Sequence, residues 1–360
     1  MSLNYITILF GFIISFFLFN KFPQVKKTQN KVYRKVSIII PSRNEENNIE
    51  NILSDLEKQD FDIQEIICVD DNSTDSTAEK IKKHDVKYLL LDNLPKGWKG
   101  KTWACQNGAL AAIGDLLLFI DADVRLSKSA VSSLVAHYSK QDIPLSVQPY
   151  HTVNKLYEFY SFFFNFIQVC VTYLSVYKKE KYLGFYGPVF LVDRELFLEK
   201  AGYSKVKNEV VEDLFLGKYY NSIGINIDLL LGGDEIKFKM YPKGFAQLLE
   251  GWSKNFSKAS VSISVGIFVM MFLWIGYILA LPVELVKAIL AQNLLYSVVL
   301  ASIYIITVLK MYRDIKKIGS YPLFVCILFP VYLLAFLLIF LYSIFGTYIL
   351  KTTTWKGRKV

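Results

Sequence analysis

The sequence predicts an α/β domain with a largely parallel sheet, placed between apolar segments of the kind that enter membranes. Between residues 35 and 260, short β-branched runs alternate with amphipathic helical stretches, a pattern typical of parallel sheets. Long stretches without charge stand toward both ends of the chain. Of the 360 residues, 53% are hydrophobic and 15% are aromatic. This composition excludes a disordered chain and disfavours a purely soluble protein.

The formal net charge of +9 results from 41 Lys and Arg residues against 32 Asp and Glu residues. Such an excess on an apolar chain is typical of nucleic-acid binding or of the cytoplasmic flanks of membrane spans. Much of this charge lies beside the apolar segments, so we expect no nucleic-acid partner. The four cysteines show no CxxC spacing and are interpreted as core residues.

We expect residues 1–20 to form a membrane anchor and residues 21–34 to form a basic linker. No charge occurs from Tyr5 to Phe19, and basic residues follow that stretch. Because no small-residue cleavage site is present, an anchor is favoured over a cleaved signal peptide. Basic flanks stay in the cytoplasm, which places the linker there.

A C-terminal membrane region is expected over residues 261–350. Val261–Leu281 and Ala288–Leu309 are each about as long as the ~20 residues that cross a bilayer. With only Pro282–Lys287 between them, they predict a hairpin over residues 261–309.

The last apolar segment, residues 321–350, contains Pro322 and Pro330. A re-entrant or proline-broken segment is favoured because it keeps the basic tail, residues 351–360, in the cytoplasm. We therefore expect a multi-pass protein of the cell membrane whose central domain faces the cytoplasm.

The central domain, residues 35–260, includes the strongly aromatic stretch 156–177. A membrane span there would separate the two parts of the domain. An in-plane interfacial helix is therefore favoured, with a buried core helix as the alternative.

Acidic residues follow the apolar runs of this domain. Asp70 and Asp71 come after Glu65–Val69, and Asp121 and Asp123 come after Asp115–Ile120. Ligands bind at the carboxyl ends of parallel strands, and carboxylates two residues apart suit Mg²⁺ or Mn²⁺. The alternative is that these acids only cap the helices that follow.

Four motifs in order carry a resemblance: PSRNEE, VDDNSTD, GKTWACQNGALAAIGDLLLFIDADV and VVEDLFLG. Over residues 35–254 the chain resembles the inverting, nucleotide-diphospho-sugar-dependent glycosyltransferases of family 2, which have a GT-A fold. It is most similar to membrane-associated members that glucosylate a carotenoid acid. These share GWKGKTWAC, LSVQPYH, YGPV, EGWSK and WKGR with this sequence.

The resemblance implies roles for particular residues. Asp213 would be the general base, with Glu212 supporting it, and Asp121 and Asp123 would hold Mn²⁺ or Mg²⁺. The residues implied in binding the nucleotide-sugar are Pro41, Arg43, Asn44, Glu45, Asp70, Asp71, Lys101 and Asp121.

The implied acceptor or phosphate side contains Gly187, Pro188, Glu212, Gln247, Trp252 and Lys254. Polymerising family members carry Gln-x-x-Arg-Trp, whereas here the segment starting at Gln247 has Glu250 in place of Arg and places Trp252 one residue late. This departure argues against processive polysaccharide synthesis. Lys254 would supply the missing positive charge, or would simply belong to an amphipathic interfacial helix.

The resulting hypothesis is an enzyme that moves a hexose, glucose by the resemblance, from a UDP-sugar to an apolar lipid, namely a carotenoid carboxylate. The bilayer would supply the acceptor and the cytosol the donor. Two alternatives remain open: UDP-sugar-dependent glycosylation of diacylglycerol, a ceramide-like lipid or a polyprenyl phosphate, and a non-catalytic membrane scaffold.

Overall fold

The computed structural model describes residues 3–28, 32–177, 181–209, 211–259, 264–344, 354–355 and 358–359. The chain divides into two compact units, each assembled from separate stretches of sequence. The α/β unit comprises residues 23–152 and 181–240. The helical unit comprises residues 1–22, 153–180 and 241–360.

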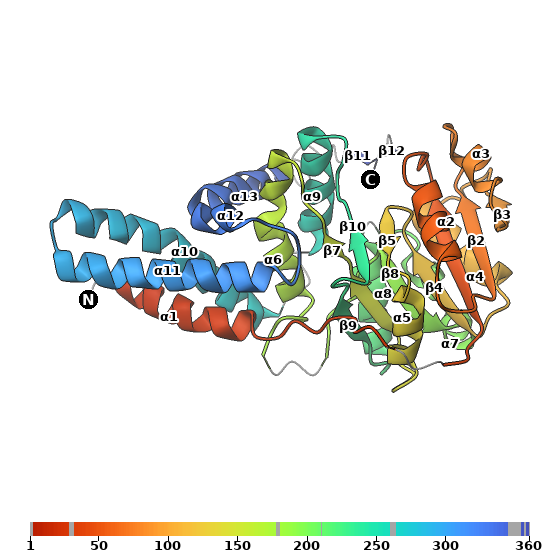
Figure 1. Cartoon of the computed structure of the whole chain (residues 1–360), viewed down its shortest axis with the longest axis horizontal. Coiled ribbons are helices and arrows are strands. Elements are labelled where there is room, and N and C mark those ends of the chain that lie inside the picture. The colour runs from red at the N-terminus through yellow and green to blue at the C-terminus, as the bar shows by residue number, and fades with distance from the viewer. Residues whose placement is uncertain are drawn as a thin grey trace. The chain divides into compact units, whose positions relative to one another are not determined.

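The α/β unit is built on a seven-stranded sheet with the order β3-β2-β1-β4-β8-β6-β9 (Figure 1). The first four strands are parallel, and β8 runs antiparallel to both β4 and β6. A smaller sheet has the order β5-β10-β7. The strands are β1 (Val36–Ser42), β2 (Glu65–Asp70), β3 (Lys87–Leu90), β4 (Leu116–Ile120), β5 (Val124–Leu126), β6 (Leu145–Gln148), β7 (Tyr150–His151), β8 (Val189–Asp193), β9 (Asp228–Leu231) and β10 (Ile236–Phe238).

Helices cover both faces of the large sheet, which explains why its strands are continuous apolar runs. Ile38 and Ile40 of β1 join the core with residues of α2 and α5, whereas Ile39 faces α4. The predicted α/β fold is thus confirmed. The helices are α2 (Ile49–Glu57), α3 (Thr77–Ile81), α4 (Gly100–Ala111), α5 (Ala130–Tyr138), α7 (Arg194–Glu199), the 3₁₀ helix η2 (Gly202–Val206) and α8 (Glu212–Ser222).

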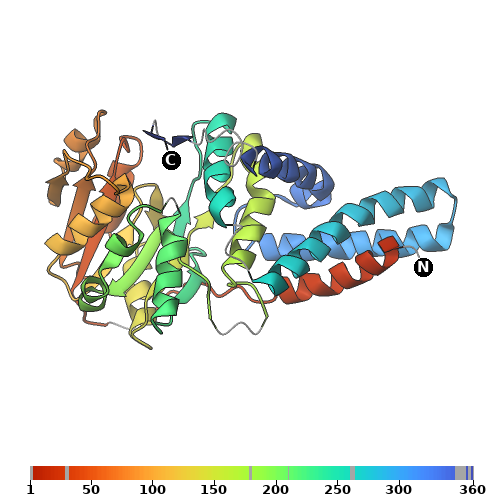
Figure 2. The same cartoon turned by 180° about the vertical axis from the view of Figure 1, so that it is seen from behind.

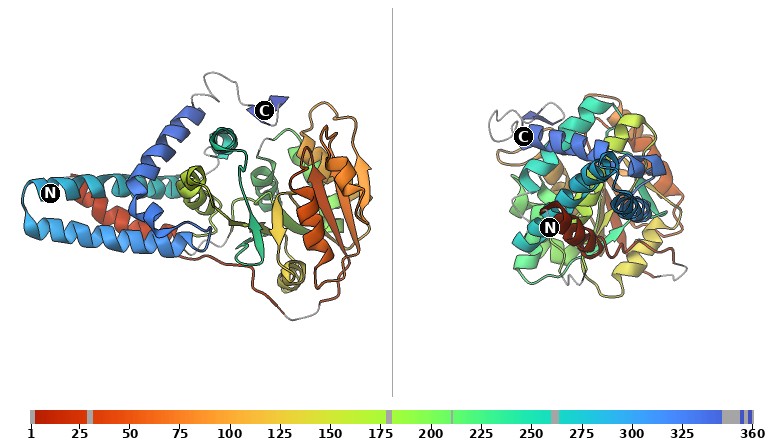
Figure 3. Two further views of the ribbon diagram at one scale, coloured as in Figure 1. Left: turned by 45° about the horizontal axis from the view of Figure 1, so that its top comes forward. Right: turned by 90° about the vertical axis from the view of Figure 1, so that its left-hand side faces the viewer.

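The helical unit contains α1 beside α10, and α10 beside α11 (Figure 2). The right panel of Figure 3 looks roughly along α1 and α11. By length and composition, α10 and α11 are apolar enough to cross a membrane, whereas α1 and α13 are shorter apolar helices. The elements are α1 (Leu3–Leu18), η1 (Leu156–Ser161), α6 (Phe162–Val171), α9 (Phe245–Ala259), α10 (Val265–Leu290), α11 (Leu294–Ile315), α12 (Leu323–Ile327), α13 (Phe329–Ile344), β11 (Thr354–Trp355) and β12 (Arg358–Lys359).

The turn of the C-terminal hairpin differs from the one predicted at Pro282–Lys287. Helix α10 continues through Pro282 to Leu290, and the chain turns at residues 291–293. Proline is tolerated in apolar helices where neighbouring groups satisfy the freed carbonyl. The turn is made instead by Gln292, which has a φ of 53°, and by Asn293, whose side chain accepts a hydrogen bond from the amide of Tyr296 and caps α11.

The last apolar segment is broken next to proline, as the sequence predicts. Helix α12 ends at Ile327 and α13 begins at Phe329, so Pro330 lies in the first turn of α13, where its missing amide costs nothing. Residues 345–350 lie outside the described part of the chain.

Most side chains of the aromatic stretch 156–177 are buried, apart from Leu156 and Tyr177 at its two ends, which corresponds to the alternative interpretation of a core helix. It forms η1 and α6, and α6 contacts α13. Its polar side chains recur every three or four residues and face protein partners: the hydroxyl of Ser161 accepts a hydrogen bond from Trp252, and the amide of Asn165 donates one to Tyr321. Buried polar stripes of this kind hold helices together in apolar surroundings.

Polar contacts near both of its ends hold α1 along the hairpin. Near its start, the Asn4 amide donates a 2.7 Å hydrogen bond to the buried carboxylate of Glu284 in α10. Near its end, the Lys310 ammonium contacts the Phe19 carbonyl at 3.4 Å and pairs with buried Asp314 at 2.6 Å. The end of α1 therefore lies beside the end of α11.

Candidate active site

The carboxyl ends of β1, β2 and β4 meet at one edge of the large sheet. Ser42 at the end of β1 stands in register with Asp70 at the end of β2, and β4 ends at Ile120, directly before Asp121. This edge is where parallel α/β sheets bind ligands. The structure therefore brings the acids that follow the apolar runs to one edge.

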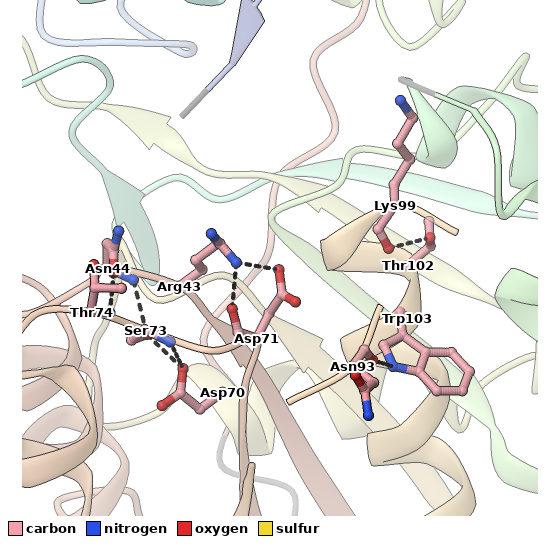
Figure 4. Close-up of polar contacts among 10 residues, drawn as sticks. All are labelled: Arg43, Asn44, Asp70, Asp71, Ser73, Thr74, Asn93, Lys99, Thr102 and Trp103. Carbon is pink, nitrogen blue, oxygen red and sulfur yellow. Dashed lines mark hydrogen bonds and ion pairs between the residues drawn. The ribbon is translucent and has the colours of Figure 1, made fainter. Parts of the chain in front are cut away.

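Four of the residues implied in nucleotide binding lie at the ends of β1 and β2, namely Arg43, Asn44, Asp70 and Asp71 (Figure 4). The Arg43 guanidinium donates to the Asp71 carbonyl at 2.7 Å and reaches the Asp71 carboxylate at 3.3 Å. Asn44 adopts a φ of 53°, and its side-chain oxygen accepts a hydrogen bond from the amide of Thr74. Pro41 lies inside β1, and the amide of Glu45 donates to the hydroxyl of Thr77.

Asp70 orders the turn after β2. One carboxylate oxygen accepts from the Ser73 amide at 2.9 Å and the Ser73 hydroxyl at 2.6 Å, and the other accepts from the Tyr88 phenol at 2.9 Å. Burial and the hydrogen bond to Asp70 raise the pKa of Tyr88 to about 12. Both carboxylate oxygens thus bond to the protein itself. Sequence reasoning missed Tyr88, which follows Asp70 by 18 positions and belongs to no motif.

Replacing Tyr88 by phenylalanine should lower the stability of the protein. The change removes one of the hydrogen bonds to the buried Asp70 carboxylate, which costs about 1.5 kcal/mol, the low end for a charged acceptor, because water reaches the partly exposed phenol. Thermal unfolding of the detergent-solubilised protein measures the effect. Tyr33→Phe is the matched control, because Tyr33 is 90% exposed. Equal unfolding temperatures of the two variants would contradict this role for Tyr88.

Lys101 lies in the first turn of α4 and joins the ends of several elements. Its ammonium lies 2.9 Å from each carboxylate oxygen of Asp121, 3.2 Å from the Gly187 carbonyl and 3.8 Å from the Glu212 carboxylate. Burial opposes its charge, but Asp121, Asp213 and Glu212 outweigh burial and raise the pKa of Lys101 well above its usual value. The charged Lys101 side chain therefore connects α4, through ion pairs, to the end of β4 and to the start of α8.

The loop before α4 is fixed by contacts on both sides. The Lys99 amide and the Thr102 hydroxyl both reach the Lys207 carbonyl, at 2.9 and 3.3 Å. The Trp103 indole donates to the Asn93 carbonyl at 3.1 Å (Figure 4), and its ring packs on Trp98 with centroids 4.9 Å apart. These contacts place the first turn of α4, and with it Lys101.

Asp121 and Asp123 lie on the turn after β4, and both remain partly exposed. In the described ranges, no three His, Cys, Asp or Glu side chains are grouped to hold a metal alone. Mg²⁺ and Mn²⁺ are commonly held by one or two carboxylates and complete their coordination with phosphate oxygens and water. Two accessible carboxylates on one turn fit such an ion.

Glu212 and Asp213 open α8, and Val210 before them lies outside the described residues. Glu212 is buried and forms the ion pair with Lys101. Asp213 packs against the backbone of Gly187: an ideal Cβ on Gly187 would lie 2.0 Å from Asp213 Oδ2 and 3.0 Å from Lys101 Nζ. Asp213, Lys101 and Gly187 thus converge. Pro188, whose carbonyl accepts from the Asp121 amide at 2.9 Å, lies next to them.

Three residues of the predicted acceptor side belong to the helical unit. The Gln247 side chain accepts from the Lys243 amide, and the side chain of Lys254 is outside the described part of the structure. Trp252 is 1% exposed, stacks on Phe164 with centroids 4.5 Å apart, and donates to Ser161. Because Trp252 lies on the buried face of α9, neighbouring side chains cover its indole ring, and an acceptor cannot stack on it.

Comparison with known proteins identifies the family. A model of glycosyl transferase family 2 matches residues 37–198. The 4,4'-diaponeurosporenoate glycosyltransferase of Staphylococcus haemolyticus is 31% identical over 256 residues, covering 69% of this chain and 68% of that protein. The protein of the same name from Staphylococcus aureus strain Newman is 29% identical over 349 residues, covering 95% of this chain and 92% of its own.

The fold has a solved counterpart. The mannosyltransferase PcManGT from Pyrobaculum calidifontis, solved with GDP-Man and Mn²⁺, superposes with a TM-score of 0.53 and 17% identity, covering 94% of this chain and 96% of that one. At this identity the likeness concerns the fold alone, which is the GT-A fold expected from the sequence. The chain belongs to glycosyltransferase family 2.

Proposed function

We propose that this enzyme transfers a hexose from a UDP-sugar to the carboxyl group of a carotenoid acid, with inversion at the anomeric carbon. The convergence of Asp121, Lys101 and Asp213 at the carboxyl edge of the sheet carries the proposal. It is supported by similarity to diaponeurosporenoate glycosyltransferases, which in one relative extends over 95% of this chain. Glucose is the hexose that the sequence resemblance implies.

The donor would lie along the ends of β1, β2 and β4. Arg43 and Asp71 would contact the nucleoside, while Asp70 holds the turn that presents them. Asp121 and Asp123 would hold Mn²⁺ or Mg²⁺, which neutralises the charge of a leaving nucleoside diphosphate. Lys101 adds a fixed positive charge beside the same carboxylate.

The acceptor would approach Asp213 along the Gly187-Pro188 turn. Its oxygen forms a bond to the anomeric carbon as the bond to the diphosphate oxygen breaks, and Asp213 takes the proton when the acceptor is a neutral acid or alcohol. When the acceptor is already ionised, Asp213 has no proton to take and acts by orienting it. Glu212 stays paired with Lys101.

A membrane arrangement is proposed with α10 and α11 as a spanning hairpin and α1 as a short anchor beside them. The Lys310–Phe19 contact brings the end of α1 to the end of α11. Basic residues follow both ends in the sequence, so both would face the cytoplasm together with the α/β unit. The proposed localisation is the cell membrane, with the bilayer supplying the acceptor.

Membranes from cells expressing the chain should convert a carotenoid acid into its hexosyl ester when supplied with radiolabelled UDP-glucose and Mn²⁺. Mass spectrometry of the lipid extract identifies the product, and membranes without the chain are the control. A hexosylated glycerolipid, ceramide or polyprenyl phosphate without hexosylated carotenoid would assign another lipid acceptor. Absence of transfer to all of these lipids would contradict the proposed activity.

A further inference from the structure

Gly187 and Pro188, which the resemblance places on the acceptor side, belong to a segment of residues 184–188 that packs closely against α8. An ideal Cβ on Gly217 of α8 would lie 2.5 Å from the Gly184 Cα, and one on Gly184 would lie 2.6 Å from the Leu214 side chain. The Phe185 amide donates to the Asp213 carbonyl at 3.3 Å. Helix α8 therefore rests directly on the backbone of this segment.

The same segment is held from its other side by polar bonds. The buried Ser146 hydroxyl of β6 donates to the Tyr186 carbonyl and accepts from the Tyr186 amide, both at 2.8 Å. Lys101 donates to the Gly187 carbonyl, and the amide of Asp121 donates to the Pro188 carbonyl. The segment is thus hydrogen-bonded to Ser146 of β6 and to Asp121, the acid that follows β4 and is proposed to bind the metal.

The Asp213 carboxylate lies where a side chain on Gly187 would stand. A Cβ at that point would be 2.0 Å from Oδ2, far closer than non-bonded atoms approach. Any residue other than glycine at this position must therefore displace the carboxylate or the turn.

We infer that residues 184–188 form a seat that positions Asp213, in which Gly187 and Ser146 are positioning residues for the transfer reaction. The inference rests on the role proposed above for Asp213. The seat fixes the position of α8 against residues 184–188. It thereby fixes the positions of the Glu212 and Asp213 carboxylates relative to Asp121. Displacement of a catalytic group by about 1 Å costs on the order of 10²-fold in rate.

Gly187→Ala should lower kcat on the order of 10²-fold and change the affinity for UDP and the KM for the UDP-sugar much less, because the added Cβ stands closer to Asp213 than to Lys101. In an Asp213→Asn background it should cause no further loss, because the group it displaces is already inactive. Gly266→Ala is the matched control: an ideal Cβ there meets nothing within 4 Å. Thermal unfolding and UDP titration establish that each variant is folded.

The outcomes are separable. If Asp213→Asn retains full transfer, the proposed role of Asp213 fails and the seat loses its purpose. If Asp213→Asn is inactive but Gly187→Ala keeps its kcat, or its loss adds in full to that of Asp213→Asn, the seat alone is overturned. If Gly187→Ala does not fold, the Ser146→Ala variant tests the inference instead. Releasing the Tyr186 bonds should lower kcat without changing UDP affinity, and an unchanged kcat would overturn the inference.

Discussion

Asp213→Asn is expected to lower the transfer rate 10²- to 10⁴-fold, roughly the contribution of a general base. The amide keeps the size of the carboxylate beside Gly187 but cannot accept the acceptor's proton. Initial rates with saturating UDP-sugar, compared for a carotenoid acid and the corresponding alcohol, measure the effect. Transfer to the alcohol should show the whole of this loss, because the proton of the alcohol must always be removed.

The loss of rate measured with the acid acceptor shows which protonation state of the acid reacts. A loss equal to that of the alcohol means that the acid reacts in its neutral form, and a smaller loss means that it reacts as the anion. Asp234→Asn is the matched control, since Asp234 is fully exposed and pairs only loosely with Lys237 at 3.4 Å. Undiminished alcohol transfer by Asp213→Asn would contradict the assignment.

Asp121→Asn is expected to lower transfer on the order of 10²- to 10³-fold, because several kcal/mol of metal-derived charge stabilisation are at stake. If Mn²⁺ binds as proposed, it should raise the UDP affinity of the wild type, and Asp121→Asn should abolish this increase, which calorimetry measures without any turnover. Asp142→Asn is the control, since Asp142 is exposed and pairs with Arg34. If Mn²⁺ still raises the UDP affinity of Asp121→Asn as in wild type, the ion is held elsewhere.

The edge of the sheet was predictable from sequence because its signals are local. Each β-branched run is followed directly by its acids, and parallel pairing brings those ends together. The antiparallel placement of β8 between β4 and β6 was not predictable, because nothing within residues 189–193 specifies partners some 45 to 75 positions earlier. The Gly187 contact with Asp213 depends on this long-range pairing.

In the helical unit too, local features were predictable from the sequence and long-range contacts were not. Hydrophobic length predicted α10 and α11, but proline was a misleading sign of the turn, because apolar helices tolerate it. The stretch 156–177 was predicted to be interfacial because a membrane span there would separate the two parts of the domain, and the sequence did not show which residues would bury it. The partners of its polar side chains, Trp252 and Tyr321, lie some 90 and 155 positions away and leave no local signal.

The polar contacts near the two ends of α1 have a consequence for biogenesis. Asn4 and the Phe19 carbonyl are bonded by residues that leave the ribosome some 280 to 290 residues later. If α1 inserts as the proposed membrane arrangement requires, it would enter the bilayer before Glu284 and Lys310 are available to bond these groups. Chains truncated before the hairpin would then contain a first helix without these contacts and would be expected to become substrates for membrane quality control, even though the α/β unit includes no residue beyond position 240.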